Sequence, residues 1–301
     1  MRHLLRDSLQ SAVRSALLIL KFIVPLYILA DILLYFDLLR YAGVLFAPLT
    51  SLLDLPPEAA IALAAGVLIN IYAAIALAAP LDLSPYQWTI LGVFLGVCHS
   101  IIVESAIMAR LGISYLYSVL LRGIGAFLAV LPVLFMPAWF FKGTAARGEV
   151  AEVAAHHHPD FLMMLAHSLK KALVLSVEII VLISLIIVVM DLLKSSTLVR
   201  RHLDRFNTSF SIIAGQLLGI TYGAGILIRE ASRGTLSRRD ILFIGTFLMI
   251  CHSLVEDVLL FVLFGANYWI IIGVRLTAAL VISFVLMRVF RVVPMRLVMR
   301  S

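Results

Sequence analysis

The stretch GVFLGVCHSIIVE, from Gly92 to Glu104, decides the fold because a close copy of it occurs later in the same chain. The second stretch is GTFLMICHSLVED, from Gly245 to Asp257, and the two align without a gap. The chain has two cysteines, and they fall on each other, each followed by His-Ser. Such a match at one constant offset indicates an internal repeat.

The repeat extends outward from this stretch in both directions. The same offset places Ser84 on Ser237, Gly112 on Gly265 and Arg122 on Arg275. We therefore expect two pseudo-symmetric copies, residues 1–145 and residues 160–301. A polar linker, residues 146–159, joins them.

The composition predicts that both copies lie in a membrane. Hydrophobic residues make up 63% of the 301 residues and charged residues 14%, whereas soluble domains are about half apolar and a quarter charged. Several apolar runs approach or exceed the roughly 20 residues that a helix needs to cross hydrocarbon: Ala16 to Phe36, Trp88 to Ala109, Tyr115 to Phe141, Ala172 to Leu193, Ile241 to Phe264 and Tyr268 to Val289. We expect an all-α polytopic protein of the inner membrane of a prokaryote. Its net charge of +7 is assigned to loops and lipid headgroups rather than to nucleic acid.

Each copy is expected to contain a span, a short interfacial helix, a weaker apolar segment and two further spans. The weaker segments are Ala59 to Pro80 and Phe210 to Ile228. If they cross the membrane the copies are parallel, and if they enter and return as hairpins the copies are inverted. Basic residues bracket the second weaker segment, and a hairpin places all of them on the cytoplasmic side. We therefore favour inverted repeats.

Each copy carries a thiol, an imidazole and a carboxylate within seven residues, and such groups are costly inside hydrocarbon. Adjacent side chains on a straight helix diverge by about 100°, so we expect two helices to meet and combine their ligands. Thiolate and imidazole suit Fe(II), Zn(II) or copper, and added carboxylates suit Mn(II). Alternatively, buried cysteine packs as a small apolar residue, and serine and histidine hold helices together. The candidate metal ligands are Cys98, His99, Glu104, Cys251, His252, Glu256 and Asp257.

Arg122 and Arg275 occupy equivalent places in the last span of each copy. They either neutralise Glu104 and Asp257 or attract an anionic substrate group. We favour ion pairing, because a buried arginine needs a compensating partner.

These residues resemble the nucleoside recognition, or Gate-domain, family of membrane proteins, which includes the membrane region of bacterial ferrous-iron permeases. The order of elements is also similar to the inverted repeats of concentrative nucleoside transporters. The resemblance implies a solute site between hairpin tips and interrupted helices. It assigns Asn70, Tyr72, Thr221 and Tyr222 to the tips, and Ser100 and Ser253 to the interrupted helices. The chain departs from the iron permeases in lacking a GTP-binding motif, and proline is absent from its Cys-His-Ser helices.

The favoured function is therefore a permease for a small solute, with a divalent transition metal first. Fe(II) leads by resemblance, and Mn(II) or Zn(II) are further candidates for the transported ion. A nucleoside or other small organic solute is one alternative, and a non-transport scaffold assisting a partner is another. We expect no enzyme, because no phosphate-binding loop, HExxH motif or catalytic dyad is visible. A homo-oligomer or an accessory subunit is left open as a partner.

Overall fold

The computed structural model describes residues 2–141, 160–195, 236–292, 294–295 and 298–299. Within these ranges the secondary structure is helical, apart from one isolated bridge between Ile113 and Met299. Among the described residues, five helical segments are long and apolar enough to cross a membrane: Ala12–Tyr35, Pro85–Arg110, Tyr115–Leu134, Phe161–Val189 and Tyr268–Val289. The prediction of an all-α, multi-span membrane protein is confirmed. The linker, residues 146–159, and the second weaker segment lie outside the described residues.

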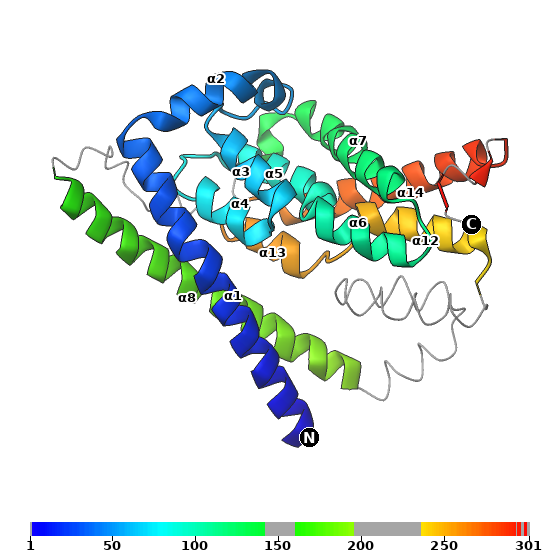
Figure 1. Cartoon of the computed structure of the whole chain (residues 1–301), viewed down its shortest axis with the longest axis horizontal. Coiled ribbons are helices and arrows are strands. Elements are labelled where there is room, and N and C mark those ends of the chain that lie inside the picture. The colour runs from blue at the N-terminus through cyan, green and yellow to red at the C-terminus, as the bar shows by residue number, and fades with distance from the viewer. Residues whose placement is uncertain (1, 142–159, 196–235, 293, 296–297, 300–301) are drawn as a thin grey trace.

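Two long helices cross each other at one side of the molecule (Figure 1). They are α1 (Arg2–Tyr35) and α8 (Phe161–Ser195), and they form an extensive contact with each other. Much of their remaining surface is apolar and exposed, including Leu17, Val177 and Leu185. Such a surface is typical of helices that face lipid acyl chains.

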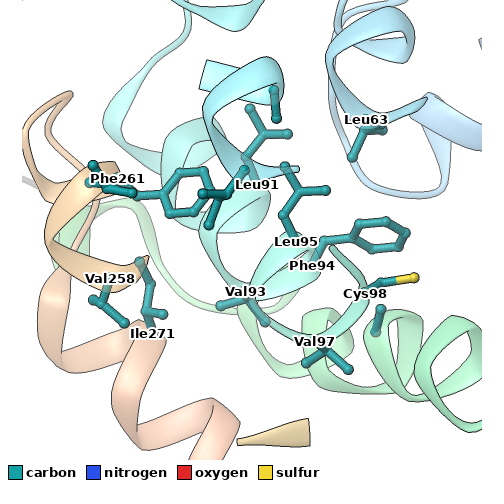
Figure 2. Packing of buried hydrophobic residues seen from close by; sticks show 14 of the residues in the cluster. Leu63, Leu91, Val93, Phe94, Leu95, Val97, Cys98, Val258, Phe261 and Ile271 are labelled. Carbon is teal, nitrogen blue, oxygen red and sulfur yellow. The ribbon is translucent and has the colours of Figure 1, made fainter. Parts of the chain in front are cut away.

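The centre of the molecule is a bundle in which α5 (Pro85–Cys98) is enclosed along its length. It packs against α7 (Tyr115–Leu134), α13 (Glu256–Val262) and α14 (Tyr268–Val289), and α12 (Arg238–Ile250) packs on α7 and α14. Figure 2 shows the apolar packing around α5, where Leu91, Val93 and Leu95 are buried. A helix that is apolar on all sides is expected in such a core position.

The first weaker segment is two short helices rather than one span. Helices α3 (Ala59–Leu68) and α4 (Ile71–Ala78) pack against each other about a break at Asn70. Asn70 is extended, and its side-chain oxygen accepts a hydrogen bond from the backbone N–H of Ala73, which caps α4. The break therefore occurs where the hairpin tip is predicted. Helix α2 (Leu38–Ser51) precedes this pair, and a short 3-10 helix, Ala138–Phe141, follows α7.

The two Cys-His-Ser stretches interrupt their helices without proline. Helix α5 ends at Cys98 and α6 (Ile101–Arg110) follows, whereas α12 ends at Ile250 and α13 begins at Glu256. Ser100 and Ser253 are both left-handed, with φ of 46° and 49°. A left-handed residue cannot continue a right-handed helix, so neither helix resumes directly after its histidine.

Aligned positions share further local structure on either side of these breaks. Ser84 and Ser237 both form a capping box at the start of their helices. Gly112 and Gly265 both adopt positive φ, 81° and 94°, where the absence of a Cβ permits a tight turn. The two-copy organisation and its inversion stay predictions, and these shared conformations agree with the alignment on which they rest.

Candidate metal centre

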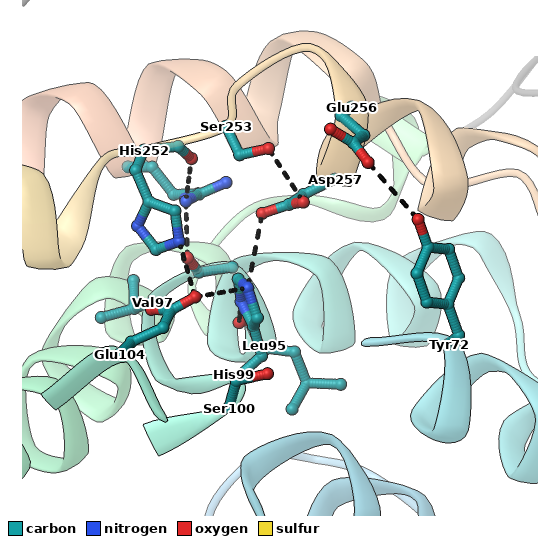
Figure 3. Close-up of polar contacts among 12 residues, drawn as sticks. Tyr72, Leu95, Val97, His99, Ser100, Glu104, His252, Ser253, Glu256 and Asp257 are labelled. Atoms are coloured by element: carbon teal, nitrogen blue, oxygen red, sulfur yellow. Dashed lines mark hydrogen bonds and ion pairs between the residues drawn. The ribbon is translucent and has the colours of Figure 1, made fainter. Parts of the chain in front are cut away.

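The site lies where the interrupted helices of the two Cys-His-Ser stretches meet (Figure 3). His99 ends α5 in an extended conformation, His252 follows the end of α12, and Glu104 lies on α6. The helices end shortly before the histidines, and the two rings lie beside each other with centroids 5.2 Å apart. The two breaks therefore bring together histidines from two separate stretches of the chain.

Glu104 lies between the two histidines. Its Oε1 atom is 2.9 Å from Nε2 of His99 and 3.3 Å from Nε2 of His252. One ligand atom from each of the three residues lies within 4.8 Å of the other two. All three side chains are buried, so the group is enclosed in the bundle.

The orientation of both rings is fixed by backbone carbonyls of their own helices. Nδ1 of His99 is 2.7 Å from the carbonyl oxygen of Leu95, and Nδ1 of His252 is 2.9 Å from that of Leu248. Because a carbonyl accepts but does not donate, each Nδ1 must carry the proton. In a neutral ring Nε2 then presents a lone pair to Glu104, which is the arrangement that metal-binding histidines use.

Lone pairs on both Nε2 atoms and a carboxylate facing them require a positive charge among them. That charge is either a proton on an imidazole or a bound cation. Neighbouring ligands of a first-row metal, each about 2.1 Å from the ion, lie roughly 3.0 to 3.4 Å apart. The nitrogen–oxygen distances of 2.9 and 3.3 Å lie close to that range.

The two arginines have different partners. Arg122 forms an ion pair with Glu104 and donates to the carbonyl of Val97, so the predicted neutralisation of Glu104 is confirmed. Arg275 is wrongly assigned to Asp257. It donates instead to the carbonyls of Gly96, His252 and Ile250, at 2.5, 2.7 and 3.4 Å. These carbonyls lie at the ends of broken helices, where backbone acceptors lack helical partners.

The serine and the two carboxylates of the second stretch lie beside this group. Ser253 donates to Oδ1 of Asp257 at 3.0 Å, and Oδ2 of Asp257 lies 3.9 Å from Nε2 of His99. Glu256 does not share a helical face with His252, because α13 begins at Glu256. Its carboxylate accepts a hydrogen bond from the Tyr72 hydroxyl at 3.4 Å.

The two cysteines do not join the ligand group, contrary to the expectation for the metal site. Cys98 and Cys251 are free and buried, and both belong to the hydrophobic core of the described chain. Figure 2 shows Cys98 among the apolar side chains of α5. Cys98 is the last residue of α5 and Cys251 directly follows the end of α12, and both side chains pack into the apolar core instead of toward Glu104.

The predicted solute-binding residues are only partly described. Ser100 donates to the carbonyl of Ile69 at 3.1 Å, so it ties the first interrupted helix to the break between α3 and α4. Asn70 caps α4 and Tyr72 contacts Glu256, as given above. Thr221 and Tyr222 lie outside the described residues.

Sequence reasoning missed the carbonyls of Leu95 and Leu248, which orient the histidines. It also missed the contact between Gly96 and Arg275. The aligned leucines, each three residues before a cysteine, are visible in both copies. However, a carbonyl acceptor carries no side-chain signal, and its role becomes visible once the helix is known to end at the histidine.

The spans and the buried polar group define a multi-span helical membrane protein with a His–Glu–His centre inside its bundle. Comparison with known proteins identifies a relative of this chain. The chain is 35% identical over 277 residues to the uncharacterized membrane protein YvoD of Bacillus subtilis (strain 168), with 87% of each chain covered, and it belongs to the family of that protein. No family model matches the chain, and no solved structure matches it.

Proposed function

We propose that this protein is a permease for a divalent transition metal, with Fe(II) as the first candidate. The transported ion binds His99, Glu104 and His252. The observation that carries the proposal is the convergence of two Nε2 atoms, from separate interrupted helices, on one buried carboxylate. We place the protein in the cytoplasmic membrane of a prokaryote.

The donor set supports a transition metal as the substrate. Two imidazole nitrogens and one carboxylate oxygen suit Fe(II), Mn(II) and Zn(II), whereas a set with thiolates would favour softer ions. The second nitrogen of each ring is already held by a carbonyl, so the ligands are oriented before an ion arrives. Three protein ligands leave coordination positions open, which suits an ion that must also be released.

The location of the group supports transport. Irregular backbone at membrane depth is tolerated where it is buried in protein or lines a cavity, and broken helices of this kind form the substrate sites of many transporters. The shared conformations at Ser100 and Ser253, and at Gly112 and Gly265, support two copies of one unit. In an inverted pair, rocking of one copy against the other would expose the site to each side in turn.

A nucleoside is less well supported, because the groups that would recognise it have other partners. The side-chain oxygen of Asn70 caps α4, and the hydroxyl of Tyr72 donates to Glu256. A scaffold without a substrate would give no reason for two oriented histidines and a carboxylate in one buried group, where polar side chains are costly.

Equilibrium binding tests the proposal directly. Purified full-length protein is titrated with Mn(II), Zn(II) and, without oxygen, Fe(II). We expect one ion to bind per protein molecule. His99→Ala and His252→Ala should each lower the affinity by at least the roughly 10- to 100-fold that loss of an outer-shell partner costs. His167→Ala is the matched control, because His167 is an exposed histidine on α8. Absence of binding by the unaltered chain, or equal binding by all three variants, would refute the metal site.

A further inference from the structure

The two carboxylates nearest the histidines differ in how their charge is balanced. Glu104 forms an ion pair with Arg122, whose side chain is fully buried. This pair has no net charge. Glu104 therefore supplies a ligand atom to the centre, but it supplies little attraction for a cation because the adjacent guanidinium cancels its field.

Asp257 occupies the position in the second stretch that corresponds to Glu104, but it lacks the corresponding ion pair. The equivalent arginine, Arg275, is directed at the carbonyls of Gly96 and His252. Within the described part of the chain, no lysine or arginine lies within ion-pair distance of Asp257. Among the described residues its buried charge therefore faces His99, at 3.9 Å, rather than a lysine or an arginine.

One oxygen of Asp257 is held in place and the other is available. Oδ1 accepts the hydrogen bond from Ser253 at 3.0 Å. Oδ2 is buried, has no hydrogen-bond partner among the described residues, and lies 3.9 Å from Nε2 of His99 (Figure 3). A buried carboxylate oxygen without a donor is costly, which indicates that it serves a ligand.

We infer that Asp257 is the fourth ligand of the metal site and that it sets the preference among divalent ions. This inference rests on the proposed function. A gap of 3.9 Å exceeds the roughly 3.0 to 3.4 Å between neighbouring ligand atoms, so a small rotation of the side chain brings Oδ2 onto an ion bound at His99.

A second carboxylate changes which ion binds best. Imidazole nitrogens favour Zn(II) over Mn(II), whereas carboxylate oxygens suit Mn(II) and reduce that difference. Asp257 also adds a negative charge that no lysine or arginine of the described residues pairs with, and a divalent ion needs such charge in a buried site. The substrate class is therefore a divalent ion that readily accepts oxygen ligands, Fe(II) or Mn(II), in preference to one that nitrogen ligands alone would select.

The decisive variant is Asp257→Asn, which keeps the size of the side chain and an oxygen that can accept from Ser253. Purified full-length protein is titrated with Mn(II) and with Zn(II), and the ratio of the two dissociation constants is compared with that of the unaltered chain. We expect Mn(II) affinity to fall roughly tenfold more than Zn(II) affinity. Asp82→Asn, an exposed aspartate before α5, is the matched control and should leave the ratio unchanged.

Asp257→Glu provides a second test that does not depend on the asparagine variant folding. It keeps the negative charge, so we expect its ratio of Mn(II) to Zn(II) dissociation constants to stay near that of the unaltered chain. An unchanged Mn(II)-to-Zn(II) ratio in Asp257→Asn, or an equal loss in Asp257→Glu, would overturn the role of Asp257. Failure of the unaltered chain to bind either ion would instead refute the proposed function, so the two failures are distinguishable.

Discussion

Nε2 of His252 lies 3.3 Å from Oε1 of Glu104, although the two residues come from different Cys-His-Ser stretches. The contact joins the first interrupted helix to the second, and both side chains are buried in the bundle. It also explains why both helices must stop, because each break turns a histidine toward the other stretch. The consequences of this arrangement can be tested residue by residue.

The ion pair between Glu104 and Arg122 should behave as a unit. Glu104→Gln leaves a buried guanidinium without its carboxylate, so we expect it to lower the free energy of unfolding by about 3 to 5 kcal/mol. The double variant Glu104→Gln with Arg122→Gln should lose less than the sum of the two single losses. Denaturation of the protein in detergent measures these values, and simple additivity would contradict the pairing.

Gly96 should be intolerant of a side chain because Arg275 lies against it. A Cβ at this position would stand 2.8 Å from the guanidinium, which also holds the carbonyl of His252. We expect Gly96→Ala to destabilise the protein by about 1 to 3 kcal/mol and to weaken metal binding. Gly123→Ala on α7 is the control, since a Cβ there meets nothing within 4 Å. Equal stability of the two variants would argue against this packing.

The left-handed backbone at position 100 should accept glycine more readily than a branched residue. Its φ of 46° costs a residue with a Cβ roughly 1 to 2 kcal/mol, and glycine avoids that cost. Ser100→Gly also loses the hydrogen bond to Ile69, so we expect a change near zero, whereas Ser100→Val loses the bond and adds strain. Thermal unfolding of both variants checks the order. If the valine variant were the more stable one, the helix would not be broken as described.

The sequence predicts the spans and the meeting of the two stretches better than it predicts the ligands. The repeated Cys-His-Ser identifies His99 and His252, and the acid after it identifies Glu104, because such residues are costly in a membrane. It does not identify where each helix stops, and the positions of these ends decide which side chains reach the metal centre. The helices end at Cys98 and Ile250, and the non-helical backbone that follows them carries the two histidines.

The partners of the two arginines also could not be predicted from the sequence alone. Arg122 and Arg275 are equivalent in the sequence, and both donate to a carbonyl 25 positions earlier in the chain. Their remaining donors diverge because Glu104 is one methylene longer than Asp257, and Gly96 leaves space for Arg275. Both differences are visible in the alignment of the two stretches, but their effect on the arginines depends on packing.

The orientation of the two copies can be measured with introduced cysteines. Asp82 and Arg238 lie near the starts of α5 and α12 and are exposed, whereas both native cysteines are buried. We expect Asp82→Cys and Arg238→Cys to react with an impermeant thiol reagent from opposite sides of the membrane, as inverted repeats require. The chain without introduced cysteines is the control for background labelling. Reaction from the same side would show that the copies are parallel.

Uptake into liposomes tests the central claim most directly. Purified protein is reconstituted, and the influx of Fe(II), Mn(II), Zn(II) and uridine is measured side by side, with empty liposomes and His167→Ala as controls. We predict flux of a divalent metal that chelators abolish and that His99→Ala and His252→Ala reduce to the level of empty liposomes. Uridine flux that is insensitive to chelators and unchanged in the two histidine variants would contradict the account.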